Sequence, residues 1–339
     1  MSIDCKYMSR KRCSLYSSTN ELFFSLADYR NRLFTSSKLE DVIDFYDSFE
    51  NRNQLIEWMK ERPKGASYLY EVEGNKEIVV VIPTADLNGE NARNCREKIF
   101  CGLHIIFVVS GEIPDPYFTV PHNVNFGIRK AKEYHPKWIV YSGDDMIAQD
   151  DVSKLVNDLQ KLDNSKVDSV FTKPDKYHST PSLLAIPNSI FYWSITILQY
   201  FSVKAKYVRQ IYLTLKRLNS HVFFPRVDFN VGIGGRVINL LFFKKVLKFT
   251  NTLAFAIFSS KFMEENDWKL YDEVYVNEME DTDLSINLIS KVCAVIDYKI
   301  SEYIGTSLGN GLLRTVRVVP GFSYFSYKVD IGAVKIKSL

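Results

Sequence analysis

The sequence predicts an α/β fold in which a mostly parallel sheet is flanked by helices. Two observations carry this expectation. Continuous apolar runs are typical of strands that are buried on both faces, and four such runs occur at 77–82, 103–109, 138–141 and 167–172. Segments with helical spacing separate the runs, at 91–100, 124–133 and 151–162. Strands that alternate with helices at this spacing form βαβ units, so we expect consecutive strands to run parallel.

Shorter signals place further elements on either side of this sheet. A helix is expected over 53–62, because its apolar residues share one face and Pro63 follows it. A strand over 68–72 leads into a turn at Gly74-Asn75. After the sheet, a run of acidic and hydroxyl residues opens a further helix at Glu280.

These signals divide the 339 residues into a central domain with additions at both ends. The central domain is expected over 77–300, and its first half, 77–174, contains the four buried runs. Its second half, 175–300, contains an apolar and basic helical insertion. Residues 1–76 are expected to form an N-terminal extension, and residues 301–339 a C-terminal tail.

Composition excludes several classes of protein. Hydrophobic residues make up 46% of the chain and the formal net charge is only +3, whereas a disordered chain needs low hydrophobicity and a large net charge. The five cysteines are odd in number and form no C-x-x-C pair, which argues against a disulfide framework or a zinc site. No apolar signal segment follows the basic N-terminus. We therefore expect a protein of a reducing compartment, the cytoplasm.

The charge is distributed unevenly along the chain. Residues 176–263 contain 12 Lys and Arg against a single acid, Asp228, and so carry +11. Within this segment, 180–203 has no charged residue, and 204–219 combines helical apolar spacing with five cations. Three interpretations stay open: a basic amphipathic helix on the cytoplasmic face of an anionic membrane, a cationic face that binds substrate phosphates, or a membrane span.

Polar residues follow the predicted strands, at the edge of a parallel sheet where ligands bind. These residues are Pro83, Thr84 and Asp86, then Glu112, and then Asp144 and Asp145. Two adjacent carboxylates at a buried strand end repel each other, and a divalent cation such as Mg²⁺ or Mn²⁺ relieves the repulsion. The alternative is that Asp144 and Asp145 cap the following turn. Asp150 and Asp151 are expected to cap the helix over 151–162.

Two other groups of residues are chemically suggestive. Neither a P-loop nor a dinucleotide-binding G-x-G-x-x-G follows a strand, so we interpret the glycines at 232, 234 and 235 as backbone that approaches a ligand closely. At the start of the late helix, Asp283 is expected to be an ordinary N-terminal carboxylate, whereas Asp281 is expected to be functional.

The ordered set of motifs resembles inverting glycosyltransferase family 2, whose members have the GT-A fold. Five motifs carry the resemblance and cover roughly residues 77–300: VVVIPTAD at 79–86, NFGIRKA at 125–131, WIVYSGDDM at 138–146, VGIGGRV at 231–237 and EMEDTDL at 278–284. The second predicted strand ends in Ser110-Gly111-Glu112 instead of an aspartate pair, and Ser142 stands where the family has its first D-x-D carboxylate.

The resemblance implies a role for each motif. A nucleotide-sugar would be bound by residues from several strand ends and loops: Pro83, Thr84, Asp86, Glu112, Asn125, Asp144, Gly235 and Arg236. Asp144 and Asp145 would hold Mn²⁺ or Mg²⁺ on the donor diphosphate. Glu280 and Asp281 would form the catalytic pair, with Asp281 as the general base. The implied halves are a nucleotide-binding half at 77–174 and an acceptor half at 175–300.

The implied activity is metal-dependent transfer of one sugar, with inversion, from a nucleotide-sugar to an acceptor hydroxyl. The Q/R-x-x-R-W motif of processive members is absent, which favours transfer of a single sugar. A glycan or a lipid-linked glycan is the expected acceptor. No His follows Asp281, so a late His ligand for the metal is missing.

Two rival interpretations of the same fold remain. A sugar-phosphate nucleotidyltransferase usually needs a Gly-rich loop after the first strand, and here that loop contains Gly89 alone. A catalytically silent binding protein is the second rival, and the intact Asp144, Asp145 and Asp281 speak against it. We do not expect a nucleic-acid partner, because the aromatic residues of the basic segment lie in apolar runs.

Overall fold

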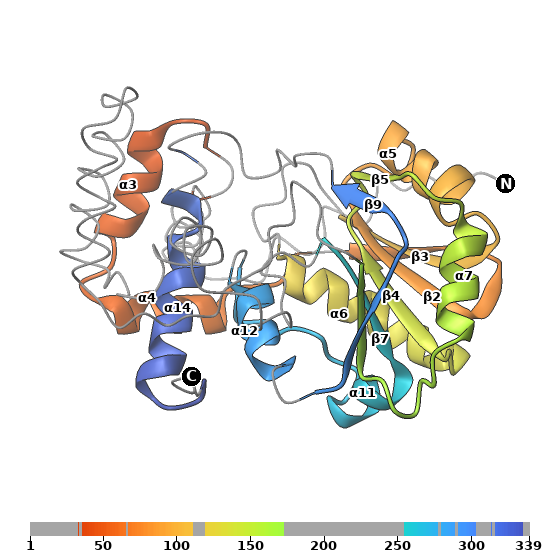
Figure 1. The fold of residues 1–339 in the computed structure, drawn as a ribbon. Coiled ribbons are helices and arrows are strands. Elements are labelled where there is room, and N and C mark those ends of the chain that lie inside the picture. Colours follow the sequence, from red (N-terminus) through yellow and green to blue (C-terminus); the bar gives the residue numbers. More distant parts are fainter. Residues whose placement is uncertain are drawn as a thin grey trace, which may run out of the picture.

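A computed structural model provides the structure of the protein. It describes residues 33, 36–65, 67–110, 119–172, 254–276, 279–288, 291–302, 313 and 316–334. A seven-stranded sheet with strand order β1-β3-β2-β4-β7-β6-β8 forms the centre of this part of the chain (Figure 1). The prediction of an α/β fold is confirmed.

Strand direction in this sheet is mixed. The strands are β1 (Ser67–Val72), β2 (Asn75–Thr84), β3 (Leu103–Ser110), β4 (Trp138–Ser142), β6 (Ser169–Thr172), β7 (Phe255–Ser259) and β8 (Cys293–Ile296). Strand β2 pairs in parallel with β3 and β4, and β6 pairs in parallel with β8. Strand β7 is antiparallel to its neighbours β4 and β6, and β1 is antiparallel to β3. Five of the seven strands therefore run in the same direction.

Helices cover both faces of the sheet, which explains why the strands are apolar without interruption. Along β2, the side chains of Ile78, Val80 and Ile82 belong to a core with α5 (Glu90–Asn94), the π-helical turn η2 (Cys95–Ile99) and α7 (Val152–Gln160). The intervening Val79 and Val81 belong to a second core, on the other face. The helices on that face are α6 (Val120–Ala131), α11 (Ser260–Glu265) and α12 (Glu280–Asn287).

Helix α6 lies unusually close to the sheet. A Cβ atom added to Gly127 would come within 2.5 Å of Val81 Cγ1 and 2.7 Å of Val108 Cγ2. Only glycine at this position lets the helix backbone approach β2 and β3 so closely. A short 3-10 turn, η3 (Lys132–Tyr134), follows α6 and leads into β4.

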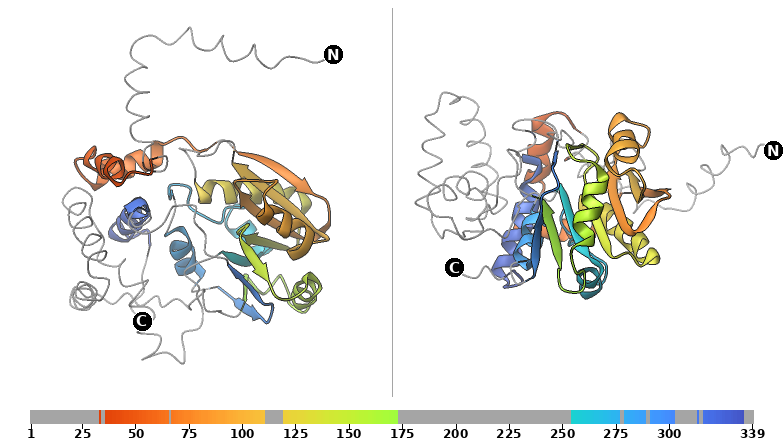
Figure 2. Two further views of the ribbon diagram at one scale, coloured as in Figure 1. Left: turned by 90° about the horizontal axis from the view of Figure 1, so that it is seen from above. Right: turned by 45° about the vertical axis from the view of Figure 1, so that its right-hand side comes forward.

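The two ends of the described chain pack together beside the sheet. Helices α3 (Leu39–Asp47), α4 (Arg52–Glu61) and α14 (Val319–Asp330) form a third apolar cluster, which also includes Tyr275, Val276 and Met279 (Figures 1 and 2). The buried Tyr46 hydroxyl donates to the carbonyl of Val316, and Arg317 Nε donates to the carbonyl of Leu33 at 2.8 Å. The described parts of the extension and of the tail therefore share one core.

The boundaries placed at residues 76 and 301 do not coincide with structural breaks. Strand β1 comes from the expected extension, yet it is a member of the main sheet and continues through Glu73-Gly74 into β2. Likewise, β9 (Ile300–Glu302) crosses the second boundary and pairs with β5 (Met146–Ala148) in a two-stranded sheet.

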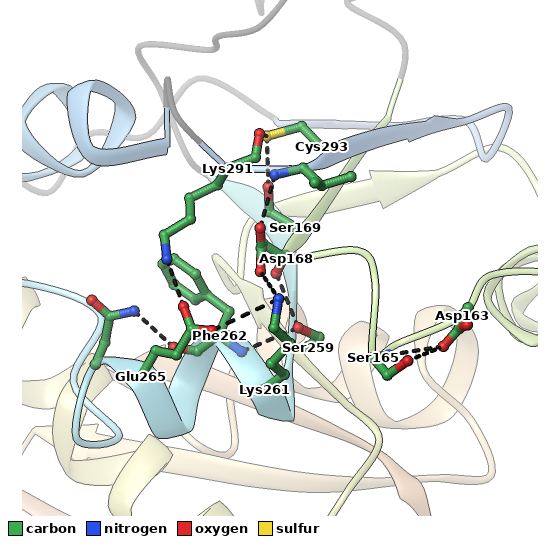
Figure 3. A network of polar contacts seen from close by, with 12 residues as sticks. Asp163, Ser165, Asp168, Ser169, Ser259, Lys261, Phe262, Glu265, Lys291 and Cys293 are labelled. Atoms are coloured by element: carbon green, nitrogen blue, oxygen red, sulfur yellow. Dashed lines mark hydrogen bonds and ion pairs between the residues drawn. The ribbon is translucent and has the colours of Figure 1, made fainter.

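A buried carboxylate joins three strands at the edge opposite the predicted site. Asp168 lies just before β6 and accepts hydrogen bonds from Val292 N at 2.8 Å and from Lys261 Nζ at 3.1 Å, while its carbonyl accepts from Ser259 N at 3.0 Å (Figure 3). These bonds connect β6, β7 and the turn into β8. Because the carboxylate and the carbonyl of Asp168 both form hydrogen bonds within the protein, we assign this residue a structural role.

Candidate functional site

The carboxyl ends of β2 and β4 bring together two residues of the predicted site. Thr84 is the last residue of β2 and is 4% exposed, and Asp144 lies two residues after the end of β4. Thr84 Oγ1 donates to Asp144 Oδ2 at 2.7 Å. Parallel pairing of β2 with β4 places both strand ends at one edge, so residues 60 positions apart in sequence meet there.

Asp86 shapes the turn that follows β2. Its backbone N–H donates to Thr84 Oγ1 at 3.3 Å, and its Oδ1 accepts from Asn88 N at 3.0 Å. Its carbonyl accepts from Gly89 N at 3.1 Å, just before α5 begins at Glu90. Asp86 is exposed and the preceding Pro83 is half-buried. Three predicted donor-binding residues therefore lie in one short segment beside Asp144: Pro83 and Thr84 at the end of β2, and Asp86 in the turn that follows.

Desolvation governs the electrostatics around Asp144. Burial raises the pKa of the Asp144 carboxyl, and the hydrogen bond from Thr84 opposes that rise. Cys95 Sγ, from η2, donates to the Asp144 carbonyl at 3.4 Å. Burial, followed by the charges of Asp144 and Asp145, raises the pKa of the Cys95 thiol to about 12. Cys95 is therefore a neutral thiol at physiological pH, and it lies close to the carboxylates of Asp144 and Asp145.

Gly143 determines where the Asp145 carboxylate lies. A Cβ atom on Gly143 would be 2.8 Å from Asp145 Oδ1, so that oxygen lies against the glycine backbone. Gly143 N also donates to the Ala254 carbonyl at 2.8 Å, which connects this loop to the residue before β7. Ser142 is fully buried, and its hydroxyl donates to the Gly143 carbonyl at 2.8 Å.

The Glu280-Asp281 pair lies in the first turn of α12, on the same face of the sheet as α6. Leu284 of this helix packs in the cluster that contains Tyr141 and Tyr271. The ring centroids of Tyr141, in β4, and Tyr271 are 5.9 Å apart. Burial raises the pKa of Tyr271 well above its usual value, and Tyr141, Asp281 and Glu280 raise it further. Tyr271 therefore lies within electrostatic reach of the pair on α12 and in contact with β4.

Asn125 has a structural environment that its predicted role did not anticipate. It is fully buried in α6, and its Oδ1 accepts from Leu270 N at 2.8 Å and Tyr271 N at 3.1 Å. Its Nδ2 donates to the Tyr271 carbonyl at 2.8 Å and to Glu273 Oε1 at 3.1 Å. With both ends of the amide in use, Asn125 holds the segment that carries Tyr271, and we leave it out of the donor-binding set.

Two expectations about ordinary carboxylates are confirmed. Asp151 caps α7, because its side chain accepts from Ser153 N at 2.8 Å. Asp283 is buried in the first turn of α12 and forms an ion pair with Lys328 at 2.5 Å. Asp150 accepts from Lys299 N at 2.8 Å instead of capping the helix.

Some of the predicted residues and segments are not among those that the structure describes. Glu112, Gly235 and Arg236 lie outside the described residues, as do the glycines at 232 and 234 and the segments 180–203 and 204–219. Among the helices that the structure describes, none is both long and apolar enough to cross a membrane. The described residues also contain no cluster of three or more His, Cys, Asp and Glu side chains that could hold a metal.

Two residues near the site were missed by sequence reasoning. Cys95 lies in a helical segment with nothing to distinguish it, and Tyr271 lies in no recognisable motif. Only the tertiary structure brings them to Asp144 and to the Glu280-Asp281 pair.

No protein-family model matches the chain, and a search of curated proteins gives no match either.

Proposed function

We propose that the protein transfers a single sugar, with inversion, from a nucleotide-sugar to an acceptor hydroxyl in a metal-dependent reaction. The observation that carries the proposal is the 2.7 Å hydrogen bond between Thr84 and Asp144. It joins the strand end expected to hold the nucleobase to the strand end expected to hold the diphosphate. Such a junction of strand ends is where open α/β sheets bind their ligands, which supports a GT-A-like arrangement of this sheet.

The donor set fits a divalent metal that is shared with the substrate. Mg²⁺ and Mn²⁺ take one or two protein carboxylates and complete their coordination with phosphate oxygens and water. Asp144 and Asp145 supply two carboxylates, and the raised pKa of Asp144 reflects a desolvated charge that a cation would stabilise. When bound, the metal would supply charge neutralisation for the leaving diphosphate.

Asp281 is the proposed general base. An acceptor hydroxyl that attacks the anomeric carbon must lose its proton, and a carboxylate within hydrogen-bond reach can accept it. Asp281 is half-buried at the start of α12. This helix lies on the sheet face where Tyr271 contacts Tyr141 of β4. In-line attack from that side would displace the nucleoside diphosphate on the opposite side and invert the configuration.

Chain topology supports an acceptor of anionic or lipid-linked character. Strand β6 ends at Thr172 and its antiparallel neighbour β7 begins at Phe255, and both of these strand ends lie at the edge where β4 ends. Residues 173–253 connect them in the sequence. These residues contain 12 Lys and Arg against two Asp. The cations of this insertion could recognise phosphate groups of an acceptor or of a membrane surface.

Ligand binding provides the direct test. The full chain is mixed with uridine-, guanosine- and thymidine-diphosphate sugars, with and without Mn²⁺, and its thermal unfolding is followed. We expect at least one donor to raise the melting temperature only when Mn²⁺ is present. Asp145→Ala should abolish the shift, whereas Asp163→Ala, at an exposed loop carboxylate (Figure 3), should retain it. Equal shifts without Mn²⁺ or in Asp145→Ala would contradict the proposal.

Turnover separates this proposal from its rivals. Incubation of the responding donor with the protein should release nucleoside diphosphate and sugar, because water can replace the acceptor. A nucleotidyltransferase would instead form sugar phosphate and nucleoside triphosphate when pyrophosphate is added. A catalytically silent protein would bind the donor and leave it intact.

A further inference from the structure

Lys328 in α14 connects two segments that lie beside the proposed site. Its Nζ lies 2.5 Å from Asp283 Oδ2 and 3.0 Å from Asp272 Oδ2. Asp283 lies two residues after Asp281 in the first turn of α12, and Asp272 directly follows Tyr271. The hydroxyl of Tyr324, also in α14, donates to Asp272 Oδ2 at 3.0 Å. One helix from the end of the chain thus contacts both segments that approach β4.

The two acids would repel each other without this lysine. Burial raises the pKa of Asp283 and the negative charge of Asp272 raises it further, while Lys328 lowers it. The side chains of Lys328 and Asp283 are only 16% and 7% exposed, so solvent screens their interaction weakly. A buried carboxylate that loses its cation keeps its desolvation cost, and it then has to move or take up a proton.

The backbone immediately before α12 is strained as well. Met279 has φ of 71°, a left-handed conformation that a side chain without a short polar group rarely adopts. Its side chain is 3% exposed and belongs to the cluster formed by α3, α4 and α14. Such a conformation persists only where the surrounding structure holds it in place. Here the same terminal helices supply both the apolar packing of Met279 and the cation on Asp283.

We infer that Lys328 is a positioning residue for the Glu280-Asp281 pair, and that α14 holds the first turn of α12 in the orientation that turnover requires. This inference rests on the proposed function for its consequence in catalysis, but the contact itself can be tested separately. It gives the C-terminal helix a part in the site, although that helix supplies no residue to the donor-binding set proposed above.

The test compares full-length variants that change one charge on the same helix. Lys328→Met removes the cation and keeps most of the apolar stem, and Lys328→Arg restores a cation. Asp330→Asn is the matched control, because Asp330 pairs with Arg52 of α4 at 2.7 Å and is 52% exposed. Each variant is measured for backbone hydrogen exchange over 279–288, for donor affinity with Mn²⁺, and for turnover of the donor that responds in the thermal panel.

In Lys328→Met we expect faster exchange at 279–288 and turnover reduced by about 10- to 100-fold, because a small displacement of a catalytic group is costly. Donor affinity should change by less than about twofold, since no donor-binding residue is altered. Lys328→Arg should recover most of the turnover, and Asp330→Asn should resemble the wild type in all three measurements. Wild-type exchange and turnover in Lys328→Met would overturn the inference.

Two further outcomes are decided in advance. If Lys328→Met does not fold, the double variant Lys328→Met/Asp283→Asn replaces it, because that variant removes the buried repulsion. It should fold, exchange faster at 279–288 and lose turnover, and wild-type behaviour in both readouts would overturn the inference. If the wild type turns over no donor, the proposed function fails, and exchange at 279–288 alone then decides whether Lys328 positions α12.

Discussion

The hydroxyl of Thr84 donates to the carboxylate of Asp144 across a distance of 2.7 Å, at the point where β2 and β4 end. This contact uses one oxygen of a carboxylate that is already desolvated. It fixes the orientation of Asp144, and it favours the charged form that a cation needs. We therefore treat the pair as a unit and expect each residue to influence the other's function.

Thr84→Val removes the hydrogen bond and preserves the shape of a buried side chain. The pKa of Asp144 should rise further, because the hydrogen bond from Thr84, which lowers it, is lost. A proton then competes with the cation, so Mn²⁺-dependent donor affinity should fall by about tenfold, corresponding to a lost hydrogen bond of about 1.4 kcal/mol. The loss should grow as the pH is lowered from 7.5 to 5.5. Calorimetric titration at both pH values measures it.

Ser169→Ala is the control for this prediction. Ser169 is fully buried in β6 and its hydroxyl bonds Cys293 Sγ at 3.1 Å, at the opposite edge of the sheet (Figure 3). The Ser169→Ala substitution removes a buried hydroxyl but does not alter the surroundings of Asp144. Donor affinity that is the same in Thr84→Val and in Ser169→Ala at both pH values would rule out a role for the Thr84 contact.

Gly143→Ala should separate metal binding from stability. The added methyl would lie 2.8 Å from Asp145 Oδ1, and the carboxylate can rotate away at little cost to the fold. We expect weaker Mn²⁺-dependent donor binding and an almost unchanged melting temperature. Gly102→Ala should do the reverse: its φ of 84° disfavours alanine by about 1 kcal/mol, although nothing lies within 4 Å of the new methyl. Donor binding by Gly143→Ala at wild-type affinity would contradict the expected placement of Asp145.

Asp281→Asn should abolish turnover and leave donor binding nearly intact. Loss of a general base typically lowers the rate by about 10²- to 10⁴-fold, and the amide that replaces it cannot accept the proton. Single-turnover assays and calorimetry on the same preparation separate chemistry from binding. Asp158→Asn makes the same replacement on α7, on the other face of the sheet, and should retain activity. Near-normal turnover in Asp281→Asn would refute the assignment of the base.

Strands buried on both faces were predictable because their sequences are apolar without interruption. The runs at 77–82, 103–109 and 138–141 match β2, β3 and β4 within two residues at each end. Strand β7 was not predicted, because its apolar residues follow three lysines inside the segment that we expected to be a basic helical insertion. Helix α14 was missed because Gly321 lies in its first turn and because Ser, Tyr and Phe, which make up most of its middle, have low intrinsic helix propensity. Its packing against α3 and α4 outweighs that propensity.

The site was predictable only where it depends on strand ends. Thr84 and Asp144 meet because parallel strands place their carboxyl ends at one edge, a rule that the sequence pattern alone can invoke. Asn125 shows the limit of that reasoning. The family resemblance placed it in the donor-binding set, yet its partners are backbone groups at 270 and 271 and the Glu273 carboxylate, which come from a segment without periodicity. The contacts of Lys328 with Asp272 and Asp283 likewise join segments that are far apart in the sequence, so the sequence pattern does not predict them.

Glu273 should make stability depend on pH. His122 Nδ1 lies 2.7 Å from Glu273 Oε2, and Arg129 Nη1 donates to Oε1 at 2.8 Å. Although burial opposes it, hydrogen bonds from His122, Arg129 and Asn125 lower the pKa of Glu273 to about 2. A carboxyl whose folded pKa is depressed stabilises the fold above its unfolded pKa of about 4.5, and this contribution disappears as the pH falls towards about 2.

Glu273→Gln should therefore lower the free energy of unfolding by about 2 kcal/mol at pH 7. Urea denaturation should show a smaller difference between variant and wild type at pH 3, because there Glu273 of the unfolded wild type takes up a proton and part of the charge contribution to stability is lost. Glu264→Gln provides a comparison on an exposed carboxylate of α11 and should be neutral at both pH values. A variant that is equally destabilised at pH 7 and pH 3 would show that the loss comes from packing and not from charge.

The basic insertion should bind anionic membranes through charge. Near a membrane surface each Lys or Arg contributes about 1 kcal/mol, and 204–219 contains five of them. We expect the full chain to float with vesicles that contain phosphatidylserine and to stay unbound with neutral phosphatidylcholine vesicles. Binding should weaken as salt rises from 0.1 to 0.5 M, because the screening length shortens from about 10 Å to a few ångströms. Lys216→Gln/Arg217→Gln should weaken flotation, whereas Lys161→Gln/Lys166→Gln, at residues 72% and 80% exposed beside α7, should not. Equal flotation on neutral and anionic vesicles would instead indicate apolar insertion, for which the uncharged 180–203 would be the segment to change.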